Sequence, residues 1–370
     1  DLLAFALKEQ INLTVVGPEA PLSQGVVDVF RANGLKIFGP TKAAAQLESS
    51  KDFAKAFMVR HNIPTAAYAT FTDATLAHDY VNEHGAPIVI KADGLAAGKG
   101  VVVAMTTVEA HSAIDAMLSD NKLGDAGARV VIEEFLTGEE ASFIVMVDGK
   151  NILPLATSQD HKRLLDADLG PNTGGMGAYS PAPVVTPEIH AKVMREIIRP
   201  TVEGMAKDGI PYTGFLYAGL MISPNGNLKT LEFNCRMGDP ETQPIMLRLK
   251  SDFVTLAEHA ANGTLNLVEA EWDRRTALGV VMASHNYPYT PRLNDIINGL
   301  PHNLDDAQVF HAGTQLIDGN VVTSGGRVLC VTALGETVKF AQQQVYKIIE
   351  EIKFSGAQYR SDIGYRAIKG

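Results

Sequence analysis

Cysteine is nearly absent from this sequence, which has only Cys235 and Cys330 among its 370 residues. Two cysteines do not make the disulfide framework of a small secreted domain, and so few of them fit a reducing compartment. The sequence also lacks an apolar run of about 20 residues, the length that a membrane-spanning helix needs, and it has no signal peptide. These absences predict a cytoplasmic protein that does not contact a membrane.

Positive charge is also in deficit, because 32 lysines and arginines face 42 aspartates and glutamates, for a formal net charge of −10. This balance argues against non-specific binding to nucleic acid, although an acidic protein can still hold a local basic pocket for phosphates. Hydrophobic residues make up 46% and charged residues 20% of the chain, which is ordinary for a globular protein. A chain of 370 residues is long enough for two or three domains.

The first 45 residues are predicted to form an α/β domain that lacks its first strand. An apolar helical face begins at once, and strands are predicted at 13–16 and 35–38 with a helix between them. Since the chain does not begin with methionine, we expect it to be a fragment of something longer. Glu19 follows the strand at 13–16, at the edge where open parallel sheets bind ligands. It either contacts a ligand there or caps the next helix.

A helix is predicted at 41–62 from the roughly helical spacing of its apolar residues. It carries Lys51 and, one turn later, Lys55. A lysine on a helix usually belongs to a solvated face, so the helix alone assigns no function to either residue. The sequence Asn-Ile-Pro ends the helix at 62–64.

The strongest local signal is the segment 88–103, in which two short apolar runs predict a β-hairpin. Lys91 ends the first run, and Gly98, Lys99 and Gly100 lie in the connecting loop. Glycine lets backbone amides approach an anion closely and lysine supplies positive charge, so the hairpin suits a polyphosphate. The spacing is not that of a P-loop, and no helix follows as in a Rossmann motif. A flexible hairpin with a surface lysine is the alternative.

Acidic residues follow the strand predicted at 129–135. Glu133 and Glu134 lie near its end, Leu136 lies in the turn that follows, and Glu140 precedes the next strand. Backbone groups at such a strand end can read the edge of a base, and a carboxylate can accept hydrogen bonds from ribose hydroxyls. An ordinary solvated turn is the alternative.

The segment 157–181 is the longest stretch for which we predict no regular structure. Its charged residues include Asp160 and Lys162, and its glycines include Gly174, Gly175 and Gly177. Long loops of compact enzymes are usually functional, so we expect a mobile lid that orders over phosphate and excludes water. We interpret His161, by contrast, as a solvated side chain.

A polar face is predicted on the strand at 228–233 and its continuation. Alternate residues of a strand point to the same side, which places Glu232, Asn234 and Arg236 together. Carboxylate and amide oxygens suit Mg²⁺, which takes few protein ligands and bridges substrate phosphates. Arg236 can hold a phosphate or an oxyanion through two hydrogen bonds. Asp239 continues this acidic edge, and a purely structural ionic cluster is the alternative.

We therefore predict three domains. They are an N-terminal α/β domain at 1–45, a central domain at 46–262 with a hairpin subdomain at about 65–136, and a C-terminal mixed β/α domain at 263–370. The last is β-rich, with strands predicted at 277–283, 308–312 and 326–332 and an amphipathic helix at 337–353.

Taken together, these segments resemble the phosphoribosylamine–glycine ligases, a family of ATP-grasp enzymes of de novo purine synthesis. The resemblance covers essentially the whole chain. Its segments are GPEAPL at 17–22, IVIKADGLAAGKGV at 88–101, VIEEFLTGEEASF at 131–143, SQDHKR at 158–163, GPNTGGMGAYSP at 170–181 and LEFNCRMGDPETQ at 231–243. The resemblance implies an α/β ATP-grasp fold with a truncated N-terminal α/β domain and a small C-terminal β-rich domain. The implied reaction joins glycine to 5-phosphoribosylamine with ATP, through a glycyl phosphate.

The resemblance also implies a role for individual residues. It implies that Lys51 and Lys91 bind the phosphates under a loop of Gly98, Lys99 and Gly100, that Glu133, Glu134 and Leu136 lie at the adenine hinge, and that Glu140 lies at the ribose. It also implies that Glu232 and Asn234 bind Mg²⁺ or Mn²⁺ and that Lys91 and Arg236 are catalytic, Arg236 by steadying the acyl phosphate. The residues that it implies for substrate binding are Glu19, Asp160, Lys162, Gly174, Gly175, Gly177 and Asp239. The implied partners are small molecules alone, ATP, glycine and 5-phosphoribosylamine, for a monomer or weak dimer.

This sequence departs from the family pattern at two further places. Gly219 stands where many ATP-grasp relatives have an aspartate ligand, and the HNYP at 285–288 is less rich in glycine than usual. Two alternatives stay open at this point. One is another ATP-grasp carboxylate–amine ligase, and the other is a nucleotide-binding module that is inactive because its N-terminal segment is missing.

Overall fold

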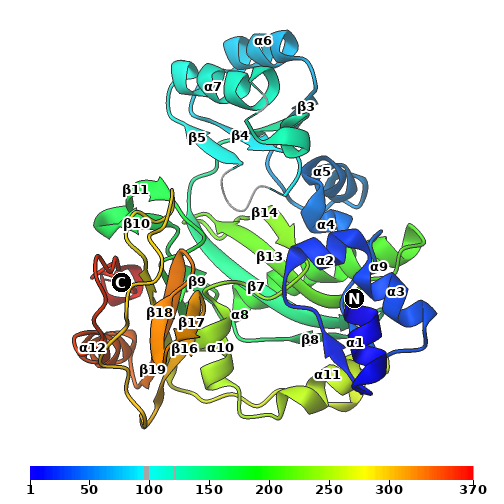
Figure 1. Ribbon diagram of the computed structural model, residues 1–370. Coiled ribbons are helices and arrows are strands. Elements are labelled where there is room, and N and C mark those ends of the chain that lie inside the picture. Colours follow the sequence, from blue (N-terminus) through cyan, green and yellow to red (C-terminus); the bar gives the residue numbers. More distant parts are fainter. Residues whose placement is uncertain (96–99, 121, 370) are drawn as a thin grey trace. The chain divides into compact units, whose positions relative to one another are not determined.

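The computed structural model describes residues 1–95, 100–120 and 122–369, so the predicted phosphate-loop residues Gly98 and Lys99 lie outside the described residues. The chain forms two compact units, which are described separately below (Figure 1). Unit 1 consists of Asp1–Pro154, Val184–Met237 and Phe253–Glu269, and unit 2 of Leu155–Pro183, Gly238–Asp252 and Ala270–Gly370. Each unit is therefore built from segments that are distant in the sequence.

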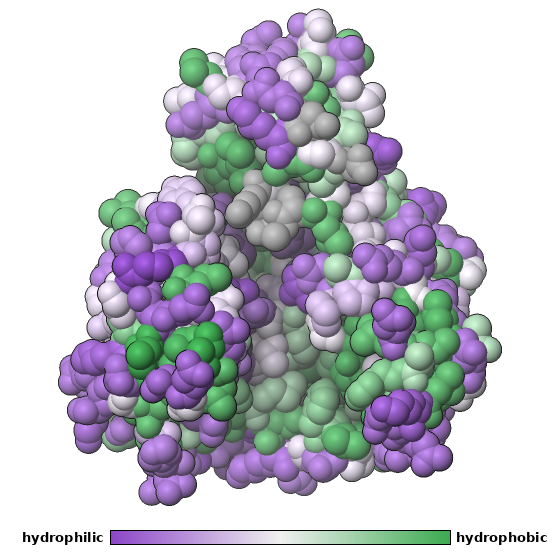
Figure 2. Space-filling model, in the orientation of Figure 1, coloured by the Kyte–Doolittle hydropathy of each residue, from purple (hydrophilic) through white to green (hydrophobic). Residues whose placement is uncertain are grey.

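Unit 1 begins with a small β–α–β arrangement. Strands β1 (Thr14–Val15) and β2 (Ile37–Phe38) pair in parallel, and helices α2 (Glu19–Gln24) and α3 (Val26–Ala32) connect them. This confirms the strands and the helix predicted for the first 45 residues. The preceding helix, α1 (Leu2–Lys8), carries exposed apolar side chains. Figure 2 shows hydrophobic and hydrophilic surface interspersed on the face that it draws.

The hairpin subdomain of unit 1 is an antiparallel sheet in the order β3-β6-β4-β5, with two helices on one face (Figure 1). The pairing of β4 with β5 confirms the predicted hairpin. Buried Ile90 and Ile132 pack with both helices, so Lys91 and Glu133, the next residues along their strands, point to the opposite face. The elements are β3 (Tyr68–Phe71), β4 (Ile88–Ala92), β5 (Val101–Ala104), β6 (Val130–Glu134), α6 (Ala74–His84) and α7 (Thr107–Ile114).

A second antiparallel sheet of unit 1 has the order β14-β13-β7-β8. It carries the polar edge predicted at 228–236, and helix α5 contacts its strand β14. The strands are β7 (Glu139–Asp148), β8 (Ile152–Pro154), β13 (Thr213–Ile222) and β14 (Leu228–Asn234). The remaining α-helices of unit 1 are α4 (Gln46–Ser49), α5 (Lys51–Arg60), α8 (Pro187–Val193), α9 (Arg199–Lys207) and α11 (Phe253–Ala261).

Unit 2 is organised around an antiparallel sheet in the order β16-β19-β15-β12-β9, on which α12 packs through Val345 and Ile349. Three of these strands and the helix confirm the elements predicted after residue 263. The main elements are β9 (Gln159–Asp160), β12 (Gly177–Ser180), β15 (Thr276–Ala283), β16 (Ala307–His311), β19 (Arg327–Gly335) and α12 (Val338–Ile349). The others are α10 (Thr242–Arg248), α13 (Tyr365–Lys369) and the hairpins β10 (Arg163–Leu165)–β11 (Leu169–Asn172) and β17 (Thr314–Ile317)–β18 (Asn320–Thr323).

The prediction of an unstructured segment at 157–181 is wrong. The segment contains four short strands, and two of them, β9 and β12, pair with each other inside the main sheet of unit 2. Gly177 shows why glycine is used there, since a Cβ atom at this position would lie 2.6 Å from the carbonyl oxygen of Gly279 on the next strand. His161 is fully buried rather than solvated, and its Nε2 accepts a hydrogen bond from the Gly364 amide at 3.0 Å.

Among residues 1–95, 100–120 and 122–369, no helix combines enough length with enough apolar character to cross a membrane.

Candidate active site

Lys91 lies at the end of β4 on the face turned away from the subdomain helices. Its side chain is 8% exposed, and its Nζ is 2.9 Å from Oε1 of Glu133 on β6. The same Nζ donates a hydrogen bond to the carbonyl oxygen of Leu231 at 3.3 Å. Leu231 directly precedes Glu232 on β14, so the structure brings a predicted phosphate lysine next to a predicted metal ligand.

Lys51 is the first residue of α5, whose N-terminus is fixed by neighbouring groups. The side chain of Ser50 caps the helix by accepting a hydrogen bond from the Phe53 amide and donates one to the Asp93 carboxylate, both at 3.1 Å. Burial lowers the pKa of the Lys51 ammonium, Glu232 raises it and Lys91 lowers it further. Lys51, Lys91 and Glu232 are therefore close enough to act on one another electrostatically.

Lys55 is a buried residue of this site that the sequence analysis left on a solvated face. It is 2% exposed, its Nζ is 2.8 Å from Oε2 of Glu133, and it donates a hydrogen bond to Oγ1 of Thr65 at 2.8 Å. Burial lowers the pKa of Lys55 to about 8, against the raising effect of Glu133. The spacing of Lys51 and Lys55, one turn apart on a helix, was the signal that could have found it.

Glu133 does not present a free carboxylate at the predicted adenine hinge, because its two oxygens face Lys55 and Lys91. Burial acts to raise the pKa of this carboxyl group, but the two ammonium groups outweigh it and the pKa is lowered. Its neighbour Glu134 is exposed and forms an ion pair with Lys229 at 2.8 Å. That hydrogen bond is the main reason why the pKa of Glu134 is lowered.

The rest of the predicted nucleotide hinge lies between β6 and β7. Leu136 is half-buried in the irregular connection, and Glu140 is exposed on β7, opposite Met221. Gly100 is the one residue of the predicted Gly-Lys-Gly loop that the structure describes, and its carbonyl oxygen accepts a hydrogen bond from the Ala92 amide at 2.7 Å. The roles of these residues stay predictions.

The alternation predicted on β14 is present in the structure. Phe233 and Cys235 are each 2% exposed, whereas Glu232 and Asn234 between them are only partly buried. Gly219 on β13 lies opposite Glu232, and a Cβ atom at Gly219 would lie 3.5 Å from Cγ of Glu232. A carboxylate and an amide oxygen on one face are the kind of oxygen donors that Mg²⁺ prefers. In the ranges that the structure describes, no group of three His, Cys, Asp or Glu side chains could hold a metal.

Arg236 follows the end of β14 and lies between two carboxylates of unit 1. Its Nε is 3.0 Å from Glu19, and another guanidinium nitrogen is 3.0 Å from Glu48. Glu19 is the first residue of α2 and also contacts Arg236, a predicted catalytic residue. Glu48, which the sequence analysis did not select, also accepts a hydrogen bond from the Cys235 amide at 2.8 Å.

We expect Glu48 to make activity sensitive to pH near neutrality. Burial raises the pKa of its carboxyl group from 4.5 to about 7, against the lowering effect of Arg236. As the pH falls through 7, Glu48 takes up a proton and its charge no longer holds Arg236. We expect kcat/KM to fall with that ionisation, and the Glu48→Gln variant to be about tenfold less active above pH 7 with this inflection missing. Measured pH profiles of both proteins check this, and an inflection that persists in the variant assigns it to another group.

In unit 2, several predicted substrate residues gather around Arg327. Arg327 donates hydrogen bonds to the carbonyl oxygen of Gly174 at 2.8 Å and to the carboxylate of Asp239 at 2.7 Å. Gly175 has a φ of +117°, a conformation that favours glycine. Arg327 is not among the predicted site residues, and the two glycines that precede it are the local signal that marks it in the sequence.

Asp160 and Lys162 form a separate pair in unit 2. The Lys162 ammonium is 3.1 Å from the Asp160 carboxylate, and Arg366 donates a hydrogen bond to the Asp160 carbonyl oxygen at 3.1 Å. Gly177 lies on β12, and its role in substrate binding stays a prediction. Arg327 thus joins Gly174 to Asp239, Gly175 lies against Asp239 and Pro240, and Asp160 and Lys162 interact with each other.

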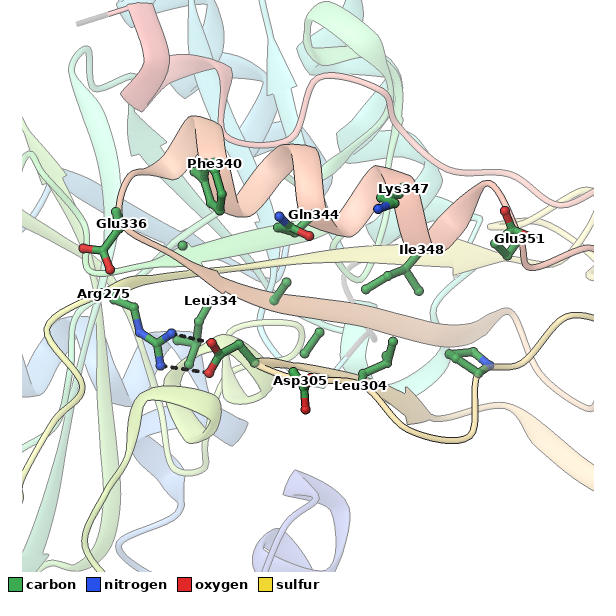
Figure 3. A pocket seen from close by; sticks show the side chains of 15 residues that line it. Arg275, Leu304, Asp305, Leu334, Glu336, Phe340, Gln344, Lys347, Ile348 and Glu351 are labelled. Atoms are coloured by element: carbon green, nitrogen blue, oxygen red, sulfur yellow. Dashed lines mark hydrogen bonds and ion pairs between the residues drawn. The ribbon is translucent and has the colours of Figure 1, made fainter.

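Figure 3 shows a pocket of about 420 Å³ in unit 2, between α12 and strands β16 and β19. Phe340 and Ile348 of α12 and Leu304 supply apolar lining, and Arg275 forms an ion pair with Asp306 at its edge, at 2.6 Å. The lining residues that the structure describes include none of the predicted site residues, so we do not place the chemistry in this pocket.

Three family models match this chain in succession. They are the N domain of phosphoribosylglycinamide synthetase at residues 1–48, its ATP-grasp (A) domain at 49–242 and its C domain at 277–366. The chain is 70% identical over 368 residues to a phosphoribosylamine–glycine ligase of Ralstonia nicotianae, covering all of this chain and 87% of the relative. It is 63% identical over 370 residues to the enzyme of that name from Escherichia coli O157:H7, covering all of this chain and 86% of that one.

Solved structures show similar folds. A phosphoribosylamine–glycine ligase from Thermotoga maritima matches with a TM-score of 0.82 and 38% identity, over 89% of this chain and 82% of that one. The biotin carboxylase domain of 2-oxoglutarate carboxylase from Hydrogenobacter thermophilus, solved with MgADP, matches with a TM-score of 0.76 over 96% of this chain and 78% of that one. Its identity is 17%, so this second match supports the fold alone.

Proposed function

The chain belongs to the phosphoribosylamine–glycine ligase family and is an ATP-dependent ligase, and we propose that the buried lysines and the β14 face of unit 1 bind its ATP. Its ATP-grasp fold and its ligase activity follow from the family models and from relatives that match the full chain.

The observation that carries this proposal is the position of buried Lys91, whose Nζ donates a hydrogen bond to the carbonyl oxygen of Leu231, the residue before Glu232. Lys91 is held against the backbone of β14, and Lys51 is under the electrostatic influence of both Lys91 and Glu232. Two ammonium groups that are largely withdrawn from water attract polyphosphate more strongly than exposed lysines do, because solvent screens them less. We assign Lys51, Lys91 and Gly100 to the phosphates. Leu136 and Glu134 are assigned to the adenine hinge and Glu140 to the ribose.

The chemical step that these residues serve is the activation of a carboxylate. The glycine carboxylate attacks the terminal phosphorus of ATP, which releases ADP and forms glycyl phosphate. The amine of 5-phosphoribosylamine then attacks the carbonyl carbon, and phosphate leaves with the bonding electrons. Since both nucleophiles belong to substrates, the protein's task is to neutralise charge and to position the reactants. We assign Arg236, held between two carboxylates, to the oxygens of the acyl phosphate.

Glu232 and Asn234 would hold the divalent cation, Mg²⁺ or Mn²⁺. Their donor atoms are a carboxylate and an amide oxygen on one face of β14, which fits a hard cation with few protein ligands. When bound, the metal neutralises charge on the ATP phosphates. Gly219 opposite Glu232 would add no side-chain donor to this site.

Each unit by itself offers polar groups for the amine and amino-acid substrates. In unit 1 we assign Glu19 as a candidate contact, and in unit 2 we assign Asp160, Lys162, Gly174, Gly175 and Asp239. The assignment of Gly174 and Asp239 is supported by the hydrogen bonds that Arg327 donates to both residues. We also propose that the protein works in the cytoplasm as a monomer or weak dimer, which light scattering of the purified protein tests.

The test of this function is ADP release from Mg-ATP by the purified chain. We expect release to require both glycine and 5-phosphoribosylamine, with glycinamide ribonucleotide formed in equal amount to ADP. Substituting alanine for glycine, or ribose 5-phosphate for the amine, provides the matched controls. Faster ADP release with a different acid and amine would overturn the substrate assignment.

A further inference from the structure

We propose that Lys55 is a positioning residue for ATP, which acts by holding Glu133 so that Glu133 fixes the ammonium group of Lys91. This inference rests on the proposed binding of phosphate by Lys91. Lys55 itself has no assigned contact with nucleotide, and its effect passes through Glu133.

The geometry is a chain of polar contacts that begins and ends on β14. Thr65 Oγ1 donates a hydrogen bond to the carbonyl oxygen of Thr230 at 2.8 Å and accepts one from Lys55 Nζ at 2.8 Å. Lys55 pairs with one oxygen of Glu133 at 2.8 Å, and Lys91 pairs with the other at 2.9 Å. Lys91 then donates to Leu231, the residue after Thr230. These contacts thus hold both lysine side chains in place against β14, the strand that carries Glu232.

Because these side chains are buried, removing one of them would leave a neighbouring buried charge without its partner, which is energetically unfavourable. The side chains of Lys55 and Glu133 are 2% and 3% exposed, so neither can exchange its partner for bulk water. A buried carboxylate with only one cation would draw that cation fully to itself. With Lys55 present, Glu133 shares its charge between two ammonium groups, and Lys91 keeps positive charge for a bound phosphate.

The charge balance of the cluster supports this role. Lys51, Lys55 and Lys91 together with Glu133 and Glu232 leave an excess of one positive charge when all five are ionised. An isolated buried charge is unfavourable, so the excess is expected where an anion binds. A cluster that served stability alone would more simply pair one lysine with one carboxylate.

The local sequence explains how α5 delivers two lysines to one place. Residues four apart lie on the same side of a helix, so Lys51 and Lys55 face the same way along α5. Ala54, Phe57 and Met58 of this helix are buried, which places the lysine side next to the apolar side rather than in solvent.

The test compares ATP with adenosine, because Lys91 contacts phosphate and adenosine has none. We expect Lys55→Met to raise the dissociation constant of ATP by about 10- to 100-fold and to leave that of adenosine unchanged. Exposed Lys207→Met is the matched control and should change neither value. A structural defect would weaken both ligands together, and equal loss for both overturns the proposal, as does unchanged ATP affinity.

A milder variant keeps the test decisive if Lys55→Met does not fold. Thr65→Val removes the hydroxyl that links Lys55 to β14 at nearly constant volume. It should weaken ATP about threefold or more relative to adenosine, and an unchanged ratio overturns the proposal. The Lys91→Met variant distinguishes a failure of the phosphate role assigned to Lys91 from a failure of the positioning role proposed for Lys55. If that variant binds ATP normally, the assigned role of Lys91 fails. If it binds poorly while both the Lys55 and Thr65 variants bind normally, only the role of Lys55 fails.

Discussion

The Lys91→Met variant is expected to form ADP about 10³-fold more slowly than the unaltered protein under saturating glycine and 5-phosphoribosylamine. The reason is that Lys91 places a largely buried ammonium group beside β14, where the proposed phosphate tail lies. Methionine keeps most of the side-chain volume but no charge. Measurement of kcat and KM for ATP should show both affected, since phosphate is bound before and during transfer.

The control for this variant separates loss of charge from loss of structure. Lys150→Met removes an exposed lysine of the same unit and should leave ADP formation within twofold of the unaltered protein. The Lys91 variant should still fold, because Glu133 retains its partner Lys55. A cooperative unfolding transition checks this. Full activity in a folded Lys91→Met variant would refute the phosphate assignment and, with it, the placement of ATP in unit 1.

The Glu232→Gln variant is expected to lose about 10²- to 10³-fold in activity at low millimolar Mg²⁺. Glutamine preserves the shape and one oxygen donor but removes the negative charge that attracts a divalent cation. The Mg²⁺ concentration for half-maximal rate should therefore rise, and excess Mg²⁺ or Mn²⁺ should restore part of the activity. Chelation by EDTA should abolish ADP formation in the unaltered protein.

Exposed Glu203 on α9 offers the matched control, because Glu203→Gln removes the same charge away from β14. Its Mg²⁺ dependence should equal that of the unaltered protein. If Glu232→Gln lowered the rate without changing the Mg²⁺ requirement, Glu232 would act on substrate rather than on the metal. An activity that survives EDTA would remove the metal from the reaction altogether.

Local patterns in the sequence were enough to predict the parts of the site that lie along one element. The alternation on β14 needed only the two-residue period of a strand, and the β4–β5 hairpin needed only its glycines and flanking apolar runs. Glu48 was not predictable in this way, and the one-turn spacing of Lys51 and Lys55 marked Lys55 without showing that its side chain is buried. The hydrogen bond from the Cys235 amide to Glu48 joins residues 187 positions apart, and no local rule gives such a pairing.

The fold of unit 2 shows the same limit. Strands β9, β10, β11 and β12 are each four residues or fewer, too short for a period to emerge, so the segment 157–181 was mistaken for a loop. The β17–β18 hairpin was missed although its turn, Asp318-Gly319, has positive φ at both residues, as two-residue hairpins prefer. That signal was present in the sequence and was overlooked.

The segmented composition of unit 2 affects the order in which a nascent chain can acquire its structure. Strand β12 (177–180) hydrogen-bonds to β15 (276–283), which the ribosome makes about a hundred residues later. A nascent chain that has not yet reached β15 exposes one backbone edge of β12 and part of its apolar face. Unit 2 therefore cannot complete its main sheet until β15 and β19 have been made, which sets a minimum chain length for closing this unit.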